Sequence, residues 1–118
     1  IVKRKLGMRA GETHKAVTEN RPELVALGRR ISETLGPVGN LDCDVFVAGK
    51  SIYLLELNPR FGGGYPFSAE AGADIPSALL AWAEGREAPR SWGEVEYGVA
   101  SAKCDRLVRI RSSADLDD

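Results

Sequence analysis

Carboxylate, amide and guanidinium side chains are concentrated at one point of this sequence, in the stretch LELNPRFGGGYPF at residues 55–67. Glu56 and Asn58 stand two residues apart in an apolar run that ends at Pro59, and three glycines follow. Alternate residues of a strand share a face, so this carboxylate and this amide are expected side by side. Mg²⁺ prefers oxygen ligands of this kind and completes its octahedron with water and substrate phosphates. The stretch therefore indicates a magnesium site.

Two further residues extend this predicted site. Asp42 belongs to the preceding predicted strand, residues 41–47, and lies 14 positions before Glu56. Arg60 follows Asn58 by two residues, and its planar guanidinium suits phosphate oxygens. Phosphoryl transfer depends on alignment and on charge neutralisation by metals and cations, which such a set of side chains could provide.

The register of the predicted hairpin decides whether its acidic residues meet. A turn centred on Gly49 places Asp42 opposite Glu56, so that the acids share a face. A two-residue turn instead places Cys43 opposite Glu56. Facing carboxylates repel each other, so either a cation or solvent on an outer face must compensate. Two interpretations of Asp44 stay open: a carboxylate near the metal, or an exposed strand residue.

The surrounding elements predict an α+β fold, an antiparallel sheet with helices packed on one face. Helix signals include a first-turn proline at Pro22, an apolar stripe with steps of three or four residues, and a stop at Gly36. Leu55 and Leu57 are expected to hold the second hairpin strand in the core. The predicted elements are strands at 1–10, 41–47, 52–57 and 107–110, helices at 22–35 and 75–84, and loops at 10–13 and 85–98.

Composition narrows the possible functions. The chain has 118 residues, of which 43% are hydrophobic and 28% charged, as in a single globular domain with a modest core. A formal net charge of −1 gives no indication of nucleic acid or an anionic membrane as a partner. The sequence has neither an apolar run of membrane-spanning length nor a signal-peptide pattern. Cys43 and Cys104 are expected to be reduced thiols in a cytoplasmic protein.

The run from Glu56 to Arg60 after an apolar strand, with an upstream acid at Asp42, resembles the C-terminal half of the ATP-grasp domain. It is most similar to carbamoyl-phosphate-synthase large-chain-like members of that superfamily. The resemblance extends from about Met8 to Gly85. Those synthases carry a serine-rich stretch where this chain has FGGGYP at residues 61–66, which favours a relative with another carboxylate substrate.

The resemblance implies ATP and Mg²⁺, or Mn²⁺, as cofactors, and it implies a role for each matching residue. In this family the strand glutamate bridges two metal ions, the asparagine binds the second ion and the upstream acid binds the first. Carried over by position, these cofactor and metal ligands are Glu56, Asn58 and Asp42. Arg60 would contact the transferring phosphoryl group, and Arg9 falls where the family places a polar or cationic residue near the phosphates.

The resemblance also implies a carboxylate–amine ligase, in which ATP phosphorylates a small-molecule carboxylate and an amine attacks the acyl phosphate. An ATP-grasp enzyme has an N-terminal half that supplies the adenine pocket and a glycine-rich loop, and neither is recognisable here. We therefore expect residues 1–111 to be a C-terminal subdomain of a longer protein, inactive when isolated, with a polar tail at 112–118. The alternative is a non-catalytic structural or interaction half-domain.

Overall fold

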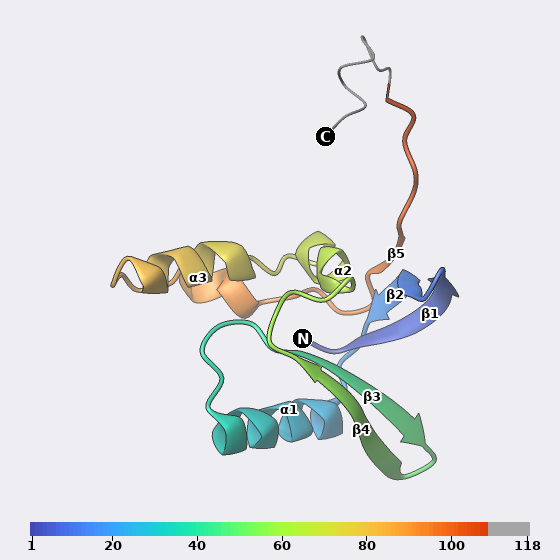
Figure 1. Cartoon of the computed structure of the whole chain (residues 1–118), viewed down its shortest axis with the longest axis horizontal. Coiled ribbons are helices and arrows are strands. Elements are labelled where there is room, and N and C mark those ends of the chain that lie inside the picture. Colours follow the sequence, from blue (N-terminus) through green and yellow to red (C-terminus); the bar gives the residue numbers. More distant parts are fainter. Residues whose placement is uncertain (109–118) are drawn as a thin grey trace.

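The computed structural model describes residues 1–108 and has an α+β fold, as predicted (Figure 1). Its strands form two antiparallel sheets, one in the order β1-β2-β5 and the other the hairpin β3-β4, so the predicted single sheet is divided in two. The elements are β1 (Lys3–Arg9), β2 (Glu12–Thr18), α1 (Pro22–Leu35), β3 (Asp42–Ala48), β4 (Ser51–Asn58), α2 (Tyr65–Glu70), α3 (Ile75–Ala83), the 3-10 helix η1 (Arg90–Gly93) and β5 (Ala100–Ala102).

The first two strands form a tight hairpin that the sequence analysis did not predict. Its two-residue turn consists of Ala10 (φ 49°) and Gly11 (φ 81°), and Arg9 pairs with Glu12 across it. Positive φ at both turn residues matches the right-handed twist of the flanking strands. The predicted loop is therefore wrong beyond Gly11, because β2 begins at the next residue.

Helix α1 was predicted correctly at both ends. Pro22 occupies its first turn, where the missing N–H costs nothing, and Gly36 ends it in the left-handed conformation (φ 56°). The N–H of Gly36 donates to the carbonyl of Ser32 at 2.9 Å. Leu27 and Ile31, on the apolar stripe of this helix, border a small groove together with Leu54 and Leu57 of β4. Across this groove the helix faces the side of the hairpin opposite the acidic side chains.

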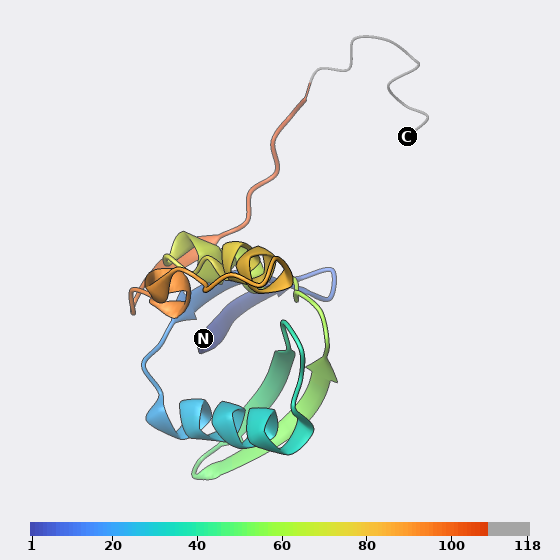
Figure 2. The ribbon, with the colours of Figure 1, turned by 90° about the vertical axis from the view of Figure 1, so that its left-hand side faces the viewer.

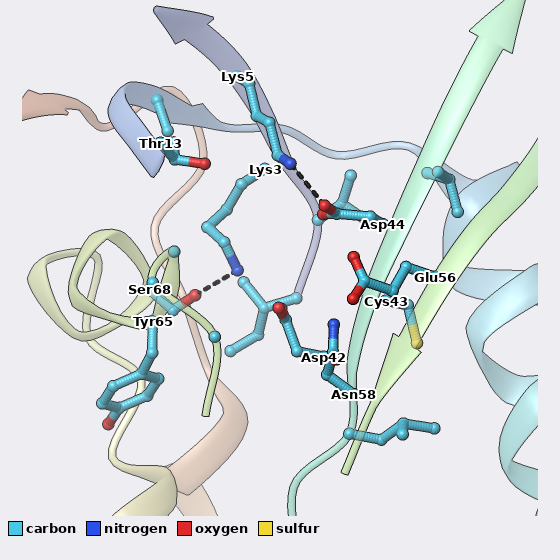
Figure 3. Close-up of a pocket in the computed structure, with 18 of the residues that line it drawn as sticks. Lys3, Lys5, Thr13, Asp42, Cys43, Asp44, Glu56, Asn58, Tyr65 and Ser68 are labelled. Atoms are coloured by element: carbon cyan, nitrogen blue, oxygen red, sulfur yellow. Dashed lines mark hydrogen bonds and ion pairs between the residues drawn. The ribbon is translucent and has the colours of Figure 1, made fainter. Parts of the chain in front are cut away.

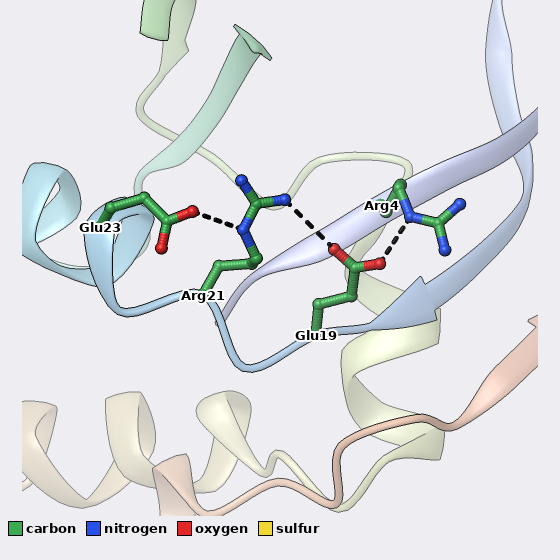
Figure 4. A network of polar contacts seen from close by, with 4 residues as sticks. All are labelled: Arg4, Glu19, Arg21 and Glu23. Carbon is green, nitrogen blue, oxygen red and sulfur yellow. Dashed lines mark hydrogen bonds and ion pairs between the residues drawn. The ribbon is translucent and has the colours of Figure 1, made fainter. Parts of the chain in front are cut away.

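A chain of ion pairs ties the β2–α1 connection to β1 (Figure 4). Arg4 Nε lies 2.5 Å from Glu19 Oε1, and Arg21 bridges Glu19 (3.7 Å) and Glu23 (2.5 Å). The hydrogen bond to Glu23 raises the pKa of Arg21. These contacts are exposed, so they orient the connection more than they stabilise the fold.

The small hydrophobic core lies mainly around α2 and α3. Helix α2 packs on β2 and β5, and Figure 2 shows α2 and α3 across the β1–β2 strands while α1 lies against the β3–β4 hairpin. Among the described residues the buried apolar side chains are Ala16, Ile31, Phe67, Ala71, Ala73, Ala78 and Ala81. Most of them are alanines, which allow these helices and strands to approach closely.

The C-terminal part of the chain departs from the prediction. The last described strand is β5, which lies between the predicted loop at 85–98 and the predicted strand at 107–110, whereas Leu107 and Val108 have no regular secondary structure. Residues 109 and 110 of the predicted last strand, and the predicted polar tail, lie outside the described residues. In residues 1–108 no helix is both long and apolar enough to span a membrane.

Candidate functional site

The β3–β4 hairpin brings the predicted polar residues onto one face through a change of register. Its turn is the two-residue form, since Ala48 pairs with Ser51. Between Asp44 and Val45 the register shifts, and beyond the shift Asp44 pairs with Glu56 and Asp42 pairs with Asn58. Neither predicted pairing of Glu56, with Asp42 or with Cys43, is correct, yet all four polar side chains share a face.

Leu55 is the extra residue of this β-bulge. Leu54 pairs with Val45 and Glu56 pairs with Asp44, which leaves Leu55 without a partner on β3. Its side chain is 66% exposed, whereas Leu57 is half-buried. The expectation that Leu55 anchors the strand in the core is therefore wrong.

A pocket of about 530 Å³ lies between this hairpin, β1, α1 and the glycine stretch that precedes α2. Asp42, Asp44, Glu56 and Asn58 line one wall, and Figure 3 shows their side chains turned toward Lys3 and Lys5 of β1. A wall rich in oxygen ligands thus faces a wall with two ammonium groups. Such a division of charge suits a cation and an anionic ligand held next to each other.

The two lysines differ in their surroundings. Lys5 Nζ donates to Asp44 Oδ2 at 2.7 Å, an exposed ion pair at the rim. Lys3 is half-buried, and its Nζ donates to Ser68 Oγ of α2 at 2.9 Å. Burial lowers the pKa of Lys3, and the carboxylates of Asp42 and Asp44 offset part of that shift.

The three glycines, Gly62 to Gly64, border the same pocket. A Cβ atom on Gly62 would overlap the carboxylate of Asp42, whereas a Cβ on Gly63 would have no neighbour closer than 3.7 Å. None of the three has a positive φ. A side chain at position 62 would therefore displace the Asp42 carboxylate, so glycine matters there for the space it leaves and not for its backbone freedom.

The two predicted arginines occupy different places. Arg60 lines the pocket; its carbonyl accepts a hydrogen bond from Asn40 at 2.7 Å and its guanidinium donates to the carbonyl of Phe61 at 3.1 Å. Arg9 is not among the pocket-lining residues, and its guanidinium pairs with Asp105 at 2.8 Å. The structure therefore brings Arg60, but not Arg9, together with the acidic hairpin.

Cys43 alternates with the acids and points to the other side of the hairpin. Figure 3 shows its sulfur turned away from the carboxylate of Glu56, and Cys43 pairs with Leu57. The thiol is half-buried, and burial raises its pKa. It therefore stays protonated near neutral pH, where it acts as a small apolar group and not as a nucleophile.

The acidic face is not a closed metal cage. Within residues 1–108 no group of three or more His, Cys, Asp or Glu side chains converges as metal ligands do. Mg²⁺ does not require such a cage, because proteins usually hold it through one or two carboxylates while water and substrate phosphates fill the remaining positions. Asp42 and Glu56, with the amide oxygen of Asn58, fit that open donor set.

The wall formed by Lys3 and Lys5 is not predicted from the sequence alone. Lys3 and Lys5 alternate around Arg4, a pattern that places both on one face of a strand and Arg4 on the other. That signal was present in the first predicted strand, but nothing in the sequence shows that this face lies opposite the β3–β4 hairpin. The juxtaposition depends on tertiary packing between segments about 40 residues apart.

The comparison with protein families agrees with this geometry. Residues 1–106 match the family described as ATP-grasp in the biosynthetic pathway with Ter operon. The chain therefore belongs to the ATP-grasp superfamily, whose members are generally ATP-dependent ligases that use Mg²⁺. The match does not distinguish a carbamoyl-phosphate-synthase-like branch. No curated protein matches the chain.

Proposed function

We propose that this chain is the metal- and phosphate-binding half of an ATP- and Mg²⁺-dependent carboxylate–amine ligase. One observation carries the proposal: Asp42, Glu56 and Asn58 share a face of the β3–β4 hairpin and line a pocket together with Arg60. Membership of the ATP-grasp family supports the nucleotide and the reaction class. A further segment, the N-terminal half of such a domain, would supply the adenine pocket.

Each residue has a role that follows from its chemistry. Asp42, Glu56 and Asn58 would hold Mg²⁺, which neutralises the phosphate charge when it is bound. Arg60 would donate from its planar guanidinium to oxygens of the transferring phosphoryl group. Arg9 can join it only after leaving Asp105, so its role near the phosphates stays a prediction.

The proposed reaction is balanced in two steps. A carboxylate oxygen of the substrate forms a bond to the γ-phosphorus, and the bond from that phosphorus to the bridging oxygen breaks, so ADP leaves with the electron pair. An amine nitrogen then attacks the acyl carbon. The C–O bond to phosphate breaks, phosphate leaves with that electron pair, and the amine loses a proton. The side chains of this chain align the reactants and balance their charge in both steps.

The alternative is a non-catalytic structural or interaction half-domain whose acids are merely solvated. A register that placed Cys43 beside Glu56 would favour it. In the structure Cys43 pairs with Leu57 and Glu56 with Asp44, so the register supports the metal-site proposal instead.

Calorimetric titration of the full-length protein with ATP, with and without Mg²⁺, tests the proposal. We expect Mg²⁺-dependent binding that is lost in Glu56→Ala and retained in Glu33→Ala, a control on the exposed surface of α1. Equal binding and equal ATP turnover by Glu56→Ala and the unaltered protein would refute the assigned role.

A further inference from the structure

Lys3 is the more buried of the two lysines in the pocket, and it lacks the ion pair that Lys5 makes. Lys5 pairs with Asp44, and Arg60 bonds to a neighbouring carbonyl at the exposed rim. Within residues 1–108 Lys3 has no carboxylate at ion-pair distance, and its Nζ is bonded to the neutral hydroxyl of Ser68. Burial of an ammonium is costly, and the carboxylates of Asp42 and Asp44, which are not at ion-pair distance, offset only part of that cost. An anion bound to Lys3 would complete this part of the pocket.

The surroundings of Lys3 form a built wall. Ser68 is 1% exposed, so its hydroxyl is held in place and its Oγ orients the ammonium. A Cβ atom on Gly64 would lie only 3.3 Å from Lys3 Cε, so the end of the glycine stretch closes against the lysine stem. An ammonium carries three donors, and the bond to Ser68 uses one of them. The others are available to a ligand in the pocket.

The place of Lys3 relative to the acidic hairpin indicates which anion it receives. Figure 3 shows Lys3 across the pocket from Asp42, Glu56 and Asn58. In the proposed function those residues and Arg60 serve the nucleotide phosphates. The attacking carboxylate must approach the γ-phosphorus from the side opposite the leaving group, so it needs its own partner.

We propose that Lys3 and Ser68 form the subsite that binds the carboxylate of the acceptor substrate. This inference rests on the proposed function. Lys3 would donate to one carboxylate oxygen and offset its charge, while Ser68 fixes the ammonium and Gly64 leaves room for its stem. Substrate choice would then depend on the segment from Gly62 to Ser68, which borders the subsite.

Acetate titration of the 118-residue chain, followed by NMR of lysine side-chain signals, tests the subsite directly. Acetate should shift the Lys3 signals saturably and leave those of Lys50, in the β3–β4 turn, unchanged. Lys3→Met should weaken acetate binding about tenfold or more, as expected for the loss of a charged hydrogen bond. Lys50→Met is the matched control and should bind acetate as the unaltered chain does.

Two further variants distinguish loss of the contact to acetate from a general disturbance of the fold. Ser68→Ala should weaken acetate binding by a smaller factor, and Lys3→Arg should restore part of it, which a merely structural role would not do. Saturable acetate binding by Lys3→Met equal to that of the unaltered chain would overturn the proposal. So would a Lys3 response no larger than that of Lys50.

Titration with inorganic phosphate distinguishes the two anions that Lys3 could bind, a substrate carboxylate and a nucleotide phosphate. Phosphate that shifts the Lys3 signals where acetate does not would assign this place to the nucleotide and overturn the carboxylate subsite. Glu56→Gln separates this inference from the proposed function, because it should lose Mn²⁺ binding and keep the acetate response. If Glu56→Gln loses Mn²⁺ binding and keeps the acetate response, the result concerns the metal site alone. If Lys3→Met loses acetate binding and keeps Mn²⁺ binding, the result concerns the carboxylate subsite alone.

Discussion

Gly62 packs so closely against Asp42 that a Cβ atom at position 62 would overlap the aspartate carboxylate. The glycine stretch after β4 and the acid on β3 are thus in direct steric contact, although 20 residues separate them. The contact fixes where the Asp42 carboxylate can lie. It also gives a structural reason for one glycine in a segment that otherwise reads as a flexible connector.

The first prediction follows from this contact. Gly62→Ala should displace the Asp42 carboxylate and weaken Mn²⁺ binding by about tenfold, a typical effect of disturbing the support of a metal ligand. Gly63→Ala is the matched control, because its Cβ has space, and it should bind Mn²⁺ normally. Titration of both variants followed by electron paramagnetic resonance of the free ion checks this. Equal affinities in the two variants would show that Gly62 does not position Asp42.

The second prediction concerns the bulge in β4. Leu55→Ala should change the free energy of unfolding by less than about 0.5 kcal/mol, because the side chain is exposed. Leu57→Ala should cost about 1–2 kcal/mol, since Leu57 is half-buried beside α1. Urea unfolding of the two variants measures the difference. A larger loss at Leu55 than at Leu57 would contradict the observed register.

The third prediction compares the two arginines. Arg60→Ala should weaken binding of Mg²⁺-ADP to the full-length protein about tenfold, as expected for a lost charged hydrogen bond. Arg9→Ala should have little effect, because Arg9 pairs with Asp105 away from the pocket. Calorimetric titration with ADP distinguishes them. A greater loss in Arg9→Ala would mean that Arg9 leaves Asp105 and reaches the phosphates.

The fourth prediction concerns the pH dependence of stability. Burial lowers the pKa of Lys3 below its ordinary value of 10.5. At a pH between the pKa of Lys3 in the folded protein and its ordinary pKa, the unfolded chain holds the lysine proton more strongly than the folded chain does. The free energy of unfolding therefore rises with pH in that window. Below the window both states are protonated and Lys3 contributes no slope.

Replacing Lys3 by Met should remove this contribution. Free energies of unfolding in urea at about pH 8 and about pH 10 should rise more in the unaltered chain than in Lys3→Met. Comparing the variants cancels the other groups that titrate in this range, including the Cys43 thiol. Lys50→Met should retain the full rise. An identical change in Lys3→Met would show that Lys3 is not buried as described.

Helix α1 and the β3–β4 hairpin were predicted because their own residues carry strong local signals. The proline at 22 and the glycine at 36 mark both ends of α1, and the alternation around Asp42 and Glu56 marks the β3–β4 hairpin. Strand β2 was missed because ETHKAVT, residues 12–18, has only two apolar side chains, Ala16 and Val17, which are adjacent and so show no alternation. Helix α2 was missed because its six residues are too few to show a periodic pattern.

The sequence predicted only the part of the candidate site that lies within the β3–β4 hairpin. Glu56 and Asn58 share a face in any regular strand, so their proximity follows from the spacing alone. The pairing of Asp44 with Glu56 depends on a bulge at Leu55, which hydrophobic patterning does not encode. The approach of Lys3 and Gly62 to this face depends on packing between distant segments, which a single sequence does not reveal.

A titration of the 118-residue chain with Mn²⁺, comparing the unaltered protein with Glu56→Gln, tests most directly whether the hairpin face is a metal site. We predict saturable binding that Glu56→Gln weakens about tenfold or more, because the variant keeps the shape of the side chain and removes its charge. Glu33→Gln should bind as the unaltered chain does. Equal Mn²⁺ affinity in Glu56→Gln and the unaltered chain would contradict the metal site.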